Sequence, residues 1–297
     1  MRLLIIYTNL PIGGIETFIV RLAAALKKKS IQVDVLFFSN KFDDNLLQKL
    51  QCDATIHYWD DYVYFPHFSK RLKPFIKLLV PIKINKLRLI FKSVTHIHAP
   101  DMLSILFYSR LNKIFKDVSI STGIYHINEF LISSFKKHYF ARLIYNFIAK
   151  LPVNNMIFFN EICFEVYNNQ FNQNFNEKLI SPIGVDINSD NINHNIAGVQ
   201  NNRIVSIGRL AKWKTYNFHI IEVIYELKQS GIELTYDSYG DGELRLDLEK
   251  RVKEKNLENN IKFHCGIPYA NFNNIISNSF VFIGAGTALI EASSLGL

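Results

Sequence analysis

Two cations five residues apart offer the clearest chemistry in this sequence. Arg209 and Lys214 lie in the run SIGRLAKWKT, directly after the apolar stretch at residues 204–207. A guanidinium fork and an ammonium group at the carboxyl end of a parallel strand supply the bidentate donors and positive charge that a diphosphate needs. Basic residues are also common in solvated loops after strands, so the pair alone does not define a site.

Glycines follow several of the predicted strands. Gly13 and Gly14 come after the first apolar run, Gly240 lies in the run YGDGE, and Gly286 precedes Thr287 in GAGTALIEASSLG. Glycine lets the backbone approach a ligand closely, and the N-terminus of the helix that follows attracts anions. Each loop could equally be an ordinary tight turn. The pattern G-x-G-x-x-G is absent from IGGIET, which argues against a dehydrogenase.

Acidic residues near these loops are candidates for sugar contacts and not for metal ligation. Glu291 lies about one helical turn after Thr287, within reach of the same region, where it could accept hydrogen bonds from a ribose. It could also be an exposed helix acid. Asp237 and Asp241 flank a turn with no third carboxylate at ligand spacing, so we predict no metal site. Asp241 is also in position to cap the next helix.

The histidines are harder to assign. His126 lies in STGIYHINEF, just beyond a predicted strand end, where it could face a cleft between domains. His96 and His98 alternate along the run THIHAPD. Two histidines at this spacing could ligate a metal, but without a neighbouring acidic or cysteine ligand a structural role is favoured.

Composition indicates a folded chain of about two domains in a reducing compartment. The 297 residues are 48% hydrophobic, and the three cysteines lie far apart in the sequence. That spacing indicates neither a disulfide framework nor a zinc site. The first residues, MRLLIIYTNL, suit a buried strand and not a signal peptide, and no apolar run is long enough to span a bilayer. We therefore expect a cytoplasmic protein.

Positive charge is concentrated in the first half of the chain. Residues 1–180 hold 23 Lys plus Arg against 13 Asp plus Glu, a net charge of +10, whereas residues 181–297 carry −2. Residues 62–100 hold eight basic residues and no acidic one, among aromatic and aliphatic side chains. The segment 66–92 therefore suits an anionic membrane surface, or else helices that pack on a sheet while their lysines reach water. No nucleic-acid-binding motif accompanies the charge, so no nucleic-acid partner is expected.

The order of apolar runs predicts an α/β fold with two doubly wound domains. Short apolar runs alternate with amphipathic stretches, as in parallel sheets covered by helices. Predicted strands lie at residues 3–7, 33–38, 94–98, 118–121 and 156–159, and then at 204–207, 234–239, 261–265 and 280–283. A helix is expected near residues 16–28, with Phe18, Leu22 and Leu26 on its buried face. The predicted domains are residues 1–186 and 203–297, joined by a polar linker at 187–202.

Five motifs in sequence resemble glycosyltransferase family 4. They are GGIETF at 13–18, SPIGVD at 181–186, GRLAKWKT at 208–215, YGDGE at 239–243 and GTALIEASSLG at 286–296. The resemblance covers nearly the whole chain. It implies the GT-B fold, in which two Rossmann-like domains face each other across a cleft. It also implies retaining, metal-independent transfer of a hexose from a nucleotide diphosphate sugar, with no other cofactor.

The resemblance also assigns roles to individual residues. Arg209 and Lys214 would bind the donor diphosphate and stabilise the leaving group. Glu291 would hold the ribose, next to Gly240, Gly286 and Thr287. Gly13 and Gly14 would approach the donor phosphates and the acceptor. His126 matches the first-domain histidine that contacts the transferred sugar, as polar support or in proton handling.

The resemblance further implies an acceptor and a cellular setting. The acceptor would be a glycan or a lipid-linked sugar in the synthesis of bacterial surface polysaccharide, such as capsule, lipopolysaccharide or O-antigen. The basic segment at 66–92 would then contact the inner face of the cytoplasmic membrane as a peripheral membrane protein does.

Two departures from the family pattern leave alternatives open. The family often carries a second Glu eight positions before the one matched by Glu291, and here that position is Ile283. Similar proteins also continue beyond the final LGL, so the second domain is expected to be incomplete, truncated at its C-terminus. A noncatalytic remnant or nucleotide-binding module is therefore an alternative to the transferase. A nucleotide-sugar epimerase is a weaker one.

Overall fold

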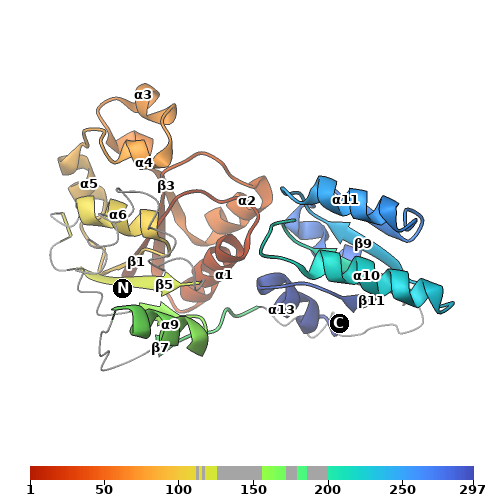
Figure 1. Ribbon diagram of the computed structural model, residues 1–297. Coiled ribbons are helices and arrows are strands. Elements are labelled where there is room, and N and C mark those ends of the chain that lie inside the picture. Colours follow the sequence, from red (N-terminus) through yellow and green to blue (C-terminus); the bar gives the residue numbers. More distant parts are fainter. Residues whose placement is uncertain (112–113, 116–117, 126–155, 172–178, 186–199) are drawn as a thin grey trace. The chain divides into compact units, whose positions relative to one another are not determined.

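The chain forms two compact α/β units, each built on one parallel sheet (Figure 1). The computed structural model describes residues 1–111, 114–115, 118–125, 156–171, 179–185 and 200–297. The units are Met1–Ile183 and Gly184–Leu297. The predicted linker at 187–202 lies outside the described residues up to residue 199, and a strand begins at Gln200, inside the predicted range.

The first unit carries a seven-stranded sheet in the order β3-β2-β1-β4-β5-β6-β7, with every pairing parallel. The strands are β1 Arg2–Tyr7, β2 Gln32–Phe37, β3 Thr55–Tyr58, β4 His96–His98, β5 Ser119–Ile124, β6 Met156–Phe158 and β7 Leu179–Ile180. Strand order reverses between β1 and β4. Ligands of such sheets bind beyond the carboxyl ends of the strands at this switch point.

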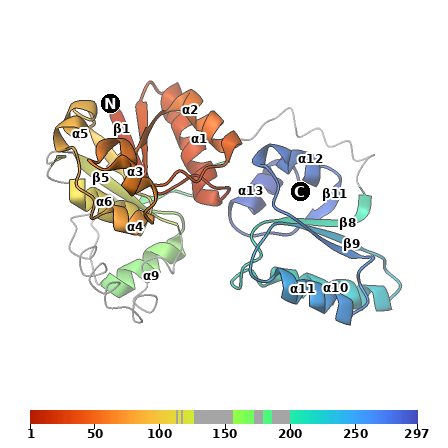
Figure 2. The same cartoon turned by 90° about the horizontal axis from the view of Figure 1, so that it is seen from above.

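Helices cover both faces of this sheet (Figure 2). The helices α1 (Gly14–Lys28) and α2 (Asp44–Asp53) lie on one side, and α5 (Ile84–Ile90) and α6 (Met102–Leu111) on the other. The 3-10 helix η1 (Trp59–Tyr62) follows β3, and α9 (Glu161–Phe171) follows β6.

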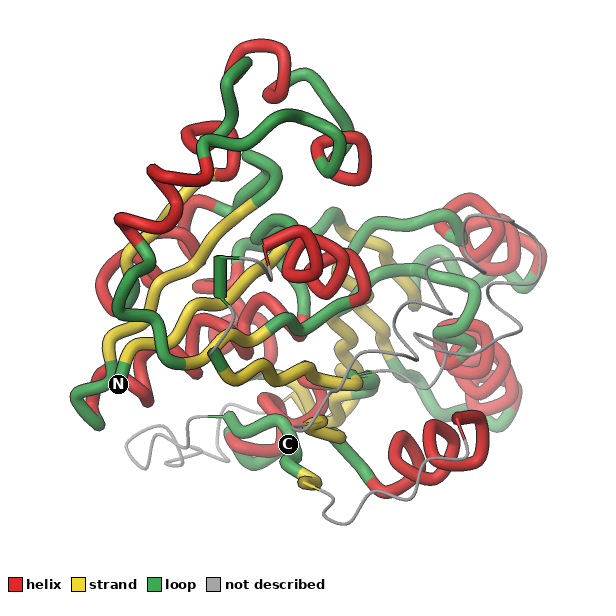
Figure 3. The backbone as a smooth tube through the Cα atoms, turned by 90° about the vertical axis from the view of Figure 1, so that its left-hand side faces the viewer, coloured by secondary structure: helices red, strands yellow, loops and turns green. Residues whose placement is uncertain are grey.

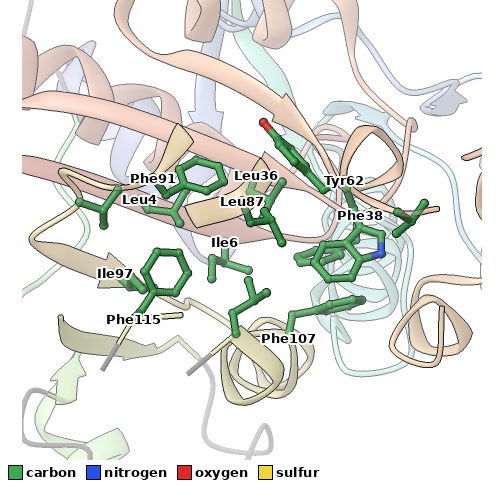
Figure 4. Packing of buried hydrophobic residues seen from close by; sticks show 14 of the residues in the cluster. Leu4, Ile6, Leu36, Phe38, Tyr62, Leu87, Phe91, Ile97, Phe107 and Phe115 are labelled. Carbon is green, nitrogen blue, oxygen red and sulfur yellow. The ribbon is translucent and has the colours of Figure 1, made fainter. Parts of the chain in front are cut away.

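The core beneath α5 and α6 is rich in aromatic rings (Figure 4). Leu4 and Ile6 of β1 pack there with Leu36 of β2, because alternate residues of a strand face the same side. Phe38, just after β2, stacks on Phe107 of α6, with ring centroids 3.2 Å apart. The apolar runs that predicted the strands therefore form the centre of the fold.

The buried face of α1 differs from the predicted one. Phe18, Leu22 and Leu26 are only half-buried, whereas Ile19 and Ala23 are inaccessible to solvent. The predicted helix is therefore confirmed, but the side of it that is buried is the one that carries Ile19 and Ala23. The ring of Phe18 instead makes edge contacts with the rings of Tyr125 and Phe159, at the carboxyl ends of β5 and β6.

A buried carboxylate ties the opposite end of the sheet together. Asp34 of β2 is inaccessible to solvent and accepts two hydrogen bonds from Arg2, at 2.6 and 2.8 Å, and one from His57 at 2.8 Å. Burial acts to raise the pKa of Asp34, but the bonds from Arg2 and His57 outweigh it and the pKa is lowered. The ionised carboxylate thus links β1, β2 and β3.

A small lobe leaves the first sheet between β3 and β4 (Figures 1 and 3). This α3–α5 lobe, residues 63–92, contains α3 (Pro66–Lys70), α4 (Pro74–Lys77) and α5. It supplies Val80, Leu87 and Phe91 to the core, as the predicted packing on the sheet requires. Its lysines do not all reach water, because Lys77 is buried and bonds both carboxylate oxygens of buried Asp60 at 2.8 Å.

The second unit repeats the start of the first on a four-stranded sheet, in the order β10-β9-β8-β11. Its strands are β8 Gln200–Ile207, β9 Thr235–Tyr239, β10 Ile261–His264 and β11 Ser279–Phe282, all parallel. One face packs against α10 (Tyr216–Gln229) and α11 (Arg245–Glu254). The other packs against α12 (Phe272–Ile276) and α13 (Thr287–Ser294), and η5 (Tyr269–Asn271) precedes α12.

Within the described parts of the chain, no helix has both the length and the apolar character needed to cross a bilayer.

The buried pair of Lys77 and Asp60 should be essential to the first unit. Asp60→Ala leaves the ammonium of Lys77 buried without its partner, so we expect the free energy of unfolding to fall by about 3–5 kcal/mol. Replacing both residues, by Asp60→Leu with Lys77→Met, should restore most of the loss. Denaturant unfolding measures both changes. Glu254→Ala, which breaks the surface pairs with Lys250 and Arg251, is the control and should cost less than about 1 kcal/mol. An equally small cost for Asp60→Ala would contradict the prediction.

Candidate nucleotide-sugar site

The loop after β8 carries the two predicted cations. Arg209 is exposed, whereas Lys214 is half-buried and folds back over Gly208. The Nζ atom of Lys214 lies 3.0 Å, and the hydroxyl of Tyr216 3.4 Å, from the position that a Cβ on Gly208 would occupy. The missing side chain at Gly208 therefore makes room for the ammonium group beside the strand end.

The two cations lie close enough to affect each other. The pKa of Lys214 is lowered, first by burial and then by the positive charge of Arg209. In the part of the chain that the structure describes, no side-chain hydrogen bond or ion pair engages either cation, although most other buried or half-buried Arg and Lys have a carboxylate or carbonyl partner. A pair of neighbouring cations, of which Lys214 is half-buried, is suited to receive an anion.

The cation loop, residues 208–215 after β8, is hydrogen-bonded through its backbone to the loop after β9, which has the sequence YGDGE. Gly208 N donates to Tyr239 O at 2.9 Å, Leu210 N to Asp241 O at 3.0 Å, and Leu244 N to Leu210 O at 3.1 Å. A Cβ on Gly240 would overlap the carbonyl oxygen of Gly208. The glycines in this loop therefore let two backbones meet.

The acidic residues of this loop also bind backbone. Asp241 accepts a hydrogen bond from Gly266 N at 2.8 Å, and Glu243 accepts one from Lys212 N at 3.2 Å. The predicted capping role of Asp241 is wrong, because α11 begins at Arg245 and no side chain caps its N-terminus. Asp241 instead ties the loop after β9 to the one after β10.

The loop after β11 presents an open helix N-terminus. Gly286 is the N-cap of α13 with φ of +71°, a conformation that favours glycine, and a Cβ there would meet nothing within 4 Å. No side chain caps α13, so its first N–H groups can face an anion. Thr287 is the first residue of α13. Glu291 lies one turn further on, half-buried, and accepts a hydrogen bond from Tyr269 Oη at 3.2 Å.

These loops leave the second sheet at one edge. Strands β8 and β11 are parallel neighbours, with Phe282 opposite Val205, so their carboxyl ends lie together. This is the switch point of the second sheet. The parallel pairing thus brings the loop of Arg209 and Lys214 and the segment from Gly286 to Glu291 to the same edge of the sheet, where open α/β sheets generally bind ligands. Gly240 supports them from the neighbouring strand.

The first-unit candidates lie at the corresponding edge of their own sheet. Gly13 is the N-cap of α1 and Gly14 its first residue, directly after β1. The Glu16 carboxylate folds over Gly13 and accepts a hydrogen bond from Tyr7 Oη at 2.9 Å. Burial, and then the charge of Glu16, raise the pKa of Tyr7. His126 lies outside the described residues.

The paired histidines have different environments. His98 is buried and bonds Ser121 Oγ at 3.0 Å and Tyr125 Oη at 3.3 Å, and burial lowers its pKa to about 4. His96 is exposed. Among the residues with described positions, no three His, Cys, Asp or Glu side chains gather as a metal site would require.

Two contacts of the site have no signal in the sequence. Tyr269 reaches Glu291 from 22 residues away, and Glu243 fixes the backbone of Lys212 from the next strand loop. Tyr269 belongs to no motif, and Glu243 closes the motif YGDGE without a role that the sequence assigns to it. Only the adjacency of parallel strands, which sequence patterns predict coarsely, brings them to the site.

Comparison with known proteins agrees with the fold of the two units. Residues 189–297 match the family model for glycosyl transferases group 1. No curated protein matches the chain. Among solved structures, Anabaena HepE, with UDP and glucose bound, superposes with a TM-score of 0.71 at 15% identity, over 99% of this chain and 78% of that one. A variant of S. aureus TarM, in complex with UDP and α-GlcNAc-glycerol among other ligands, gives 0.70 at 12%, over 99% and 84%. WaaG, a glycosyltransferase involved in lipopolysaccharide biosynthesis, gives 0.65 at 11%, over 100% and 80%.

The two Rossmann-like units and these superpositions define a protein of the GT-B fold class, as predicted. The match to the group 1 glycosyl transferase model covers residues 189–297, the part of the chain that holds the cation loop and α13.

Gly242 should be intolerant of a side chain. A Cβ there would overlap the carbonyl oxygen of Leu210, which is backbone and cannot rotate away. We expect Gly242→Ala to lower the free energy of unfolding by about 1–3 kcal/mol, the usual cost of overpacking. Gly184→Ala, where a Cβ meets nothing within 4 Å, is the control. Equal stabilities of the two variants in denaturant would show that the loops do not depend on this contact.

Proposed function

We propose that this chain transfers a hexose from a nucleotide diphosphate donor to an acceptor hydroxyl. One observation carries the proposal: Arg209 and half-buried Lys214 have no described anionic partner, and their loop leaves β8 at the same edge where the loop after its neighbour β11 leads to the uncapped N-terminus of α13. A diphosphate supplies the negative charge that this arrangement lacks. The complexes of HepE and TarM with UDP support a UDP-type donor.

In this proposal each site residue acts on one part of the donor. Arg209 and Lys214 bind the diphosphate, and the N–H groups after Gly286 add donors from the backbone. The carboxylate of Glu291, held by Tyr269, accepts hydrogen bonds from the ribose hydroxyls. Gly13 and Gly14, directly after β1 of the first unit, are proposed to let the backbone approach the donor phosphates and the acceptor.

The reaction breaks one bond and forms one bond at the anomeric carbon. The bond to the diphosphate oxygen breaks, and the acceptor oxygen bonds on the same face, so the configuration is retained. The acceptor proton passes to the departing diphosphate. The two cations stabilise the charge that grows on the leaving group, which is the role a metal ion has in other transferases. His126 would contact the transferred sugar.

The acceptor is proposed to be a glycan or lipid-linked sugar of a bacterial surface polysaccharide. The similarity to WaaG, a lipopolysaccharide enzyme, supports this class of acceptor. Such acceptors are built at the inner face of the cytoplasmic membrane, where this chain would work as a cytoplasmic, peripheral protein.

Donor binding tests the proposal directly. Titration of the protein with a panel of nucleotide diphosphate sugars should give one saturable ligand, and Arg209→Ala and Glu291→Ala should each weaken its binding by about 1–3 kcal/mol, the usual cost of losing a charge-assisted contact. Lys212→Ala removes a neighbouring exposed charge from the same loop and should change little. Folded protein that binds no donor would refute the transferase and favour a noncatalytic remnant. Donor isomerisation without acceptor would favour an epimerase.

Donor binding should also weaken at alkaline pH because of Lys214. Its pKa is lowered in the folded chain, so it loses its charge at a lower pH than an ordinary lysine. The affinity for the donor should have its full value at pH values below the pKa of Lys214 and should fall as the pH rises through that pKa. Lys214→Arg keeps its charge throughout and should remove the fall. Calorimetric titrations across the alkaline range measure both proteins, and parallel pH profiles would contradict the role of Lys214.

A further inference from the structure

Large apolar side chains are exposed at high density on the α3–α5 lobe. Nineteen such side chains are exposed in the described part of the chain, and eight belong to this lobe. They are Tyr64, Phe65, Phe68, Phe75, Ile76, Leu79, Ile84 and Leu89. Exposure reaches 81% at Leu79 and 61% at Phe68. A single exposed apolar residue needs no explanation, but this concentration marks an interaction surface.

The same lobe presents positive charge and no negative charge. Its sequence contains no Asp or Glu. Six of its basic side chains are exposed, namely Lys70, Arg71, Lys73, Lys86, Arg88 and Lys92. Lys77 does not contribute, because Asp60 neutralises it in the interior. The surface is therefore both apolar and cationic.

Packing within the unit does not account for these apolar residues. The lobe has a second, inward set of apolar side chains, and Val80, Leu87 and Phe91 of that set are buried in the core. A helix segment that only covers a sheet needs this inward set and would carry polar residues outside. Here the outside is apolar as well, in a part of the chain that also avoids acidic residues.

The lobe is held firmly at its base. Tyr64 N donates to Pro81 O at 3.1 Å, and Lys83 N donates to Tyr62 O at 2.7 Å, which closes the excursion. Arg110 of α6 donates to Val80 O at 2.6 Å. Together with the buried ion pair, these bonds fix the backbone from which Phe68 and Leu79 project.

We infer that the α3–α5 lobe is a docking surface for an anionic phospholipid bilayer. Aromatic side chains favour the headgroup level of a membrane, and exposed Leu and Ile enter the acyl boundary. Each Lys or Arg near the surface adds attraction to anionic headgroups, and no carboxylate of the lobe opposes it. The inference rests on the proposed function, which has the chain work at a membrane, and deepens it by naming the surface and the lipid charge; no lobe residue belongs to the donor site.

Vesicle flotation of the whole protein tests this surface. Binding to phosphatidylcholine vesicles should rise at least about tenfold when they contain phosphatidylglycerol, and high salt should reduce the gain. Leu79→Glu and Phe68→Ser should each weaken binding by about tenfold. Lys70→Gln with Lys73→Gln should remove much of the dependence on phosphatidylglycerol.

Matched controls separate this surface from general stickiness and from the donor site. Leu246, which is 78% exposed on α11, and Lys250 of the same helix match the lobe residues. Leu246→Glu and Lys250→Gln should leave vesicle binding unchanged, and the lobe variants should keep wild-type melting temperatures and donor affinity. Equal binding by lobe and control variants, or no binding to phosphatidylglycerol vesicles, would overturn the inference. A dimer that dissociates on Leu79→Glu without vesicles would assign the lobe to self-association instead.

Discussion

The close contact of two loop backbones at the carboxyl edge of the second sheet is the constraint on which the candidate site depends. Leu210 donates to the loop after β9 and accepts from it. Such an approach is possible only because Gly240 and Gly242 have no Cβ. With its backbone fixed there, the loop turns so that Lys214 folds over Gly208 and Arg209 stands in solvent. The chemistry of the cations therefore rests on residues that bear no functional group.

Strand order explains why motifs about 80 residues apart lie at the same edge of the second sheet. The four strands of the second unit repeat the order of the first four in the first unit, and in both the reversal falls beside the first strand. The loop after that strand carries Gly13 and Gly14 in one unit and Arg209 and Lys214 in the other. Parallel strands bring all carboxyl ends to one edge, so the loop after β11 must join the loop after β8. The strand order thus determines which loops lie at the candidate site, and the side chains of those loops determine its charge.

Sequence predicts the parts of this fold that rest on local pattern. Buried strands of a parallel sheet contain apolar runs, so β1, β2 and the second half of β8 could be located closely. β3 could not, because TIHY is an edge strand with half-exposed side chains. Partners far apart in the sequence could not be predicted either. A lysine in a basic run is expected to be exposed, and only the fold brings Asp60 to Lys77. The assignment of Arg209 and Lys214 came from a motif. Tyr269 has none, and its contact with Glu291 emerges only from neighbouring strand ends.

In this chain, cations that stabilise the fold can be told from candidate ligand-binding cations by whether a carboxylate partners them. Arg2 binds Asp34, Arg203 binds Asp237, and Lys77 binds Asp60, each where a charge leaves water. Burial of a charge is unfavourable unless an opposite charge compensates it, so these pairs are what folding alone would produce. Lys214 departs from that rule, because it is half-buried and the charge that acts on it is that of another cation, Arg209, which lowers its pKa. Folding gains nothing from this arrangement. A negatively charged ligand at this edge would remove the repulsion and gain two charge-assisted contacts, so the cost that the free chain bears becomes binding energy for a diphosphate.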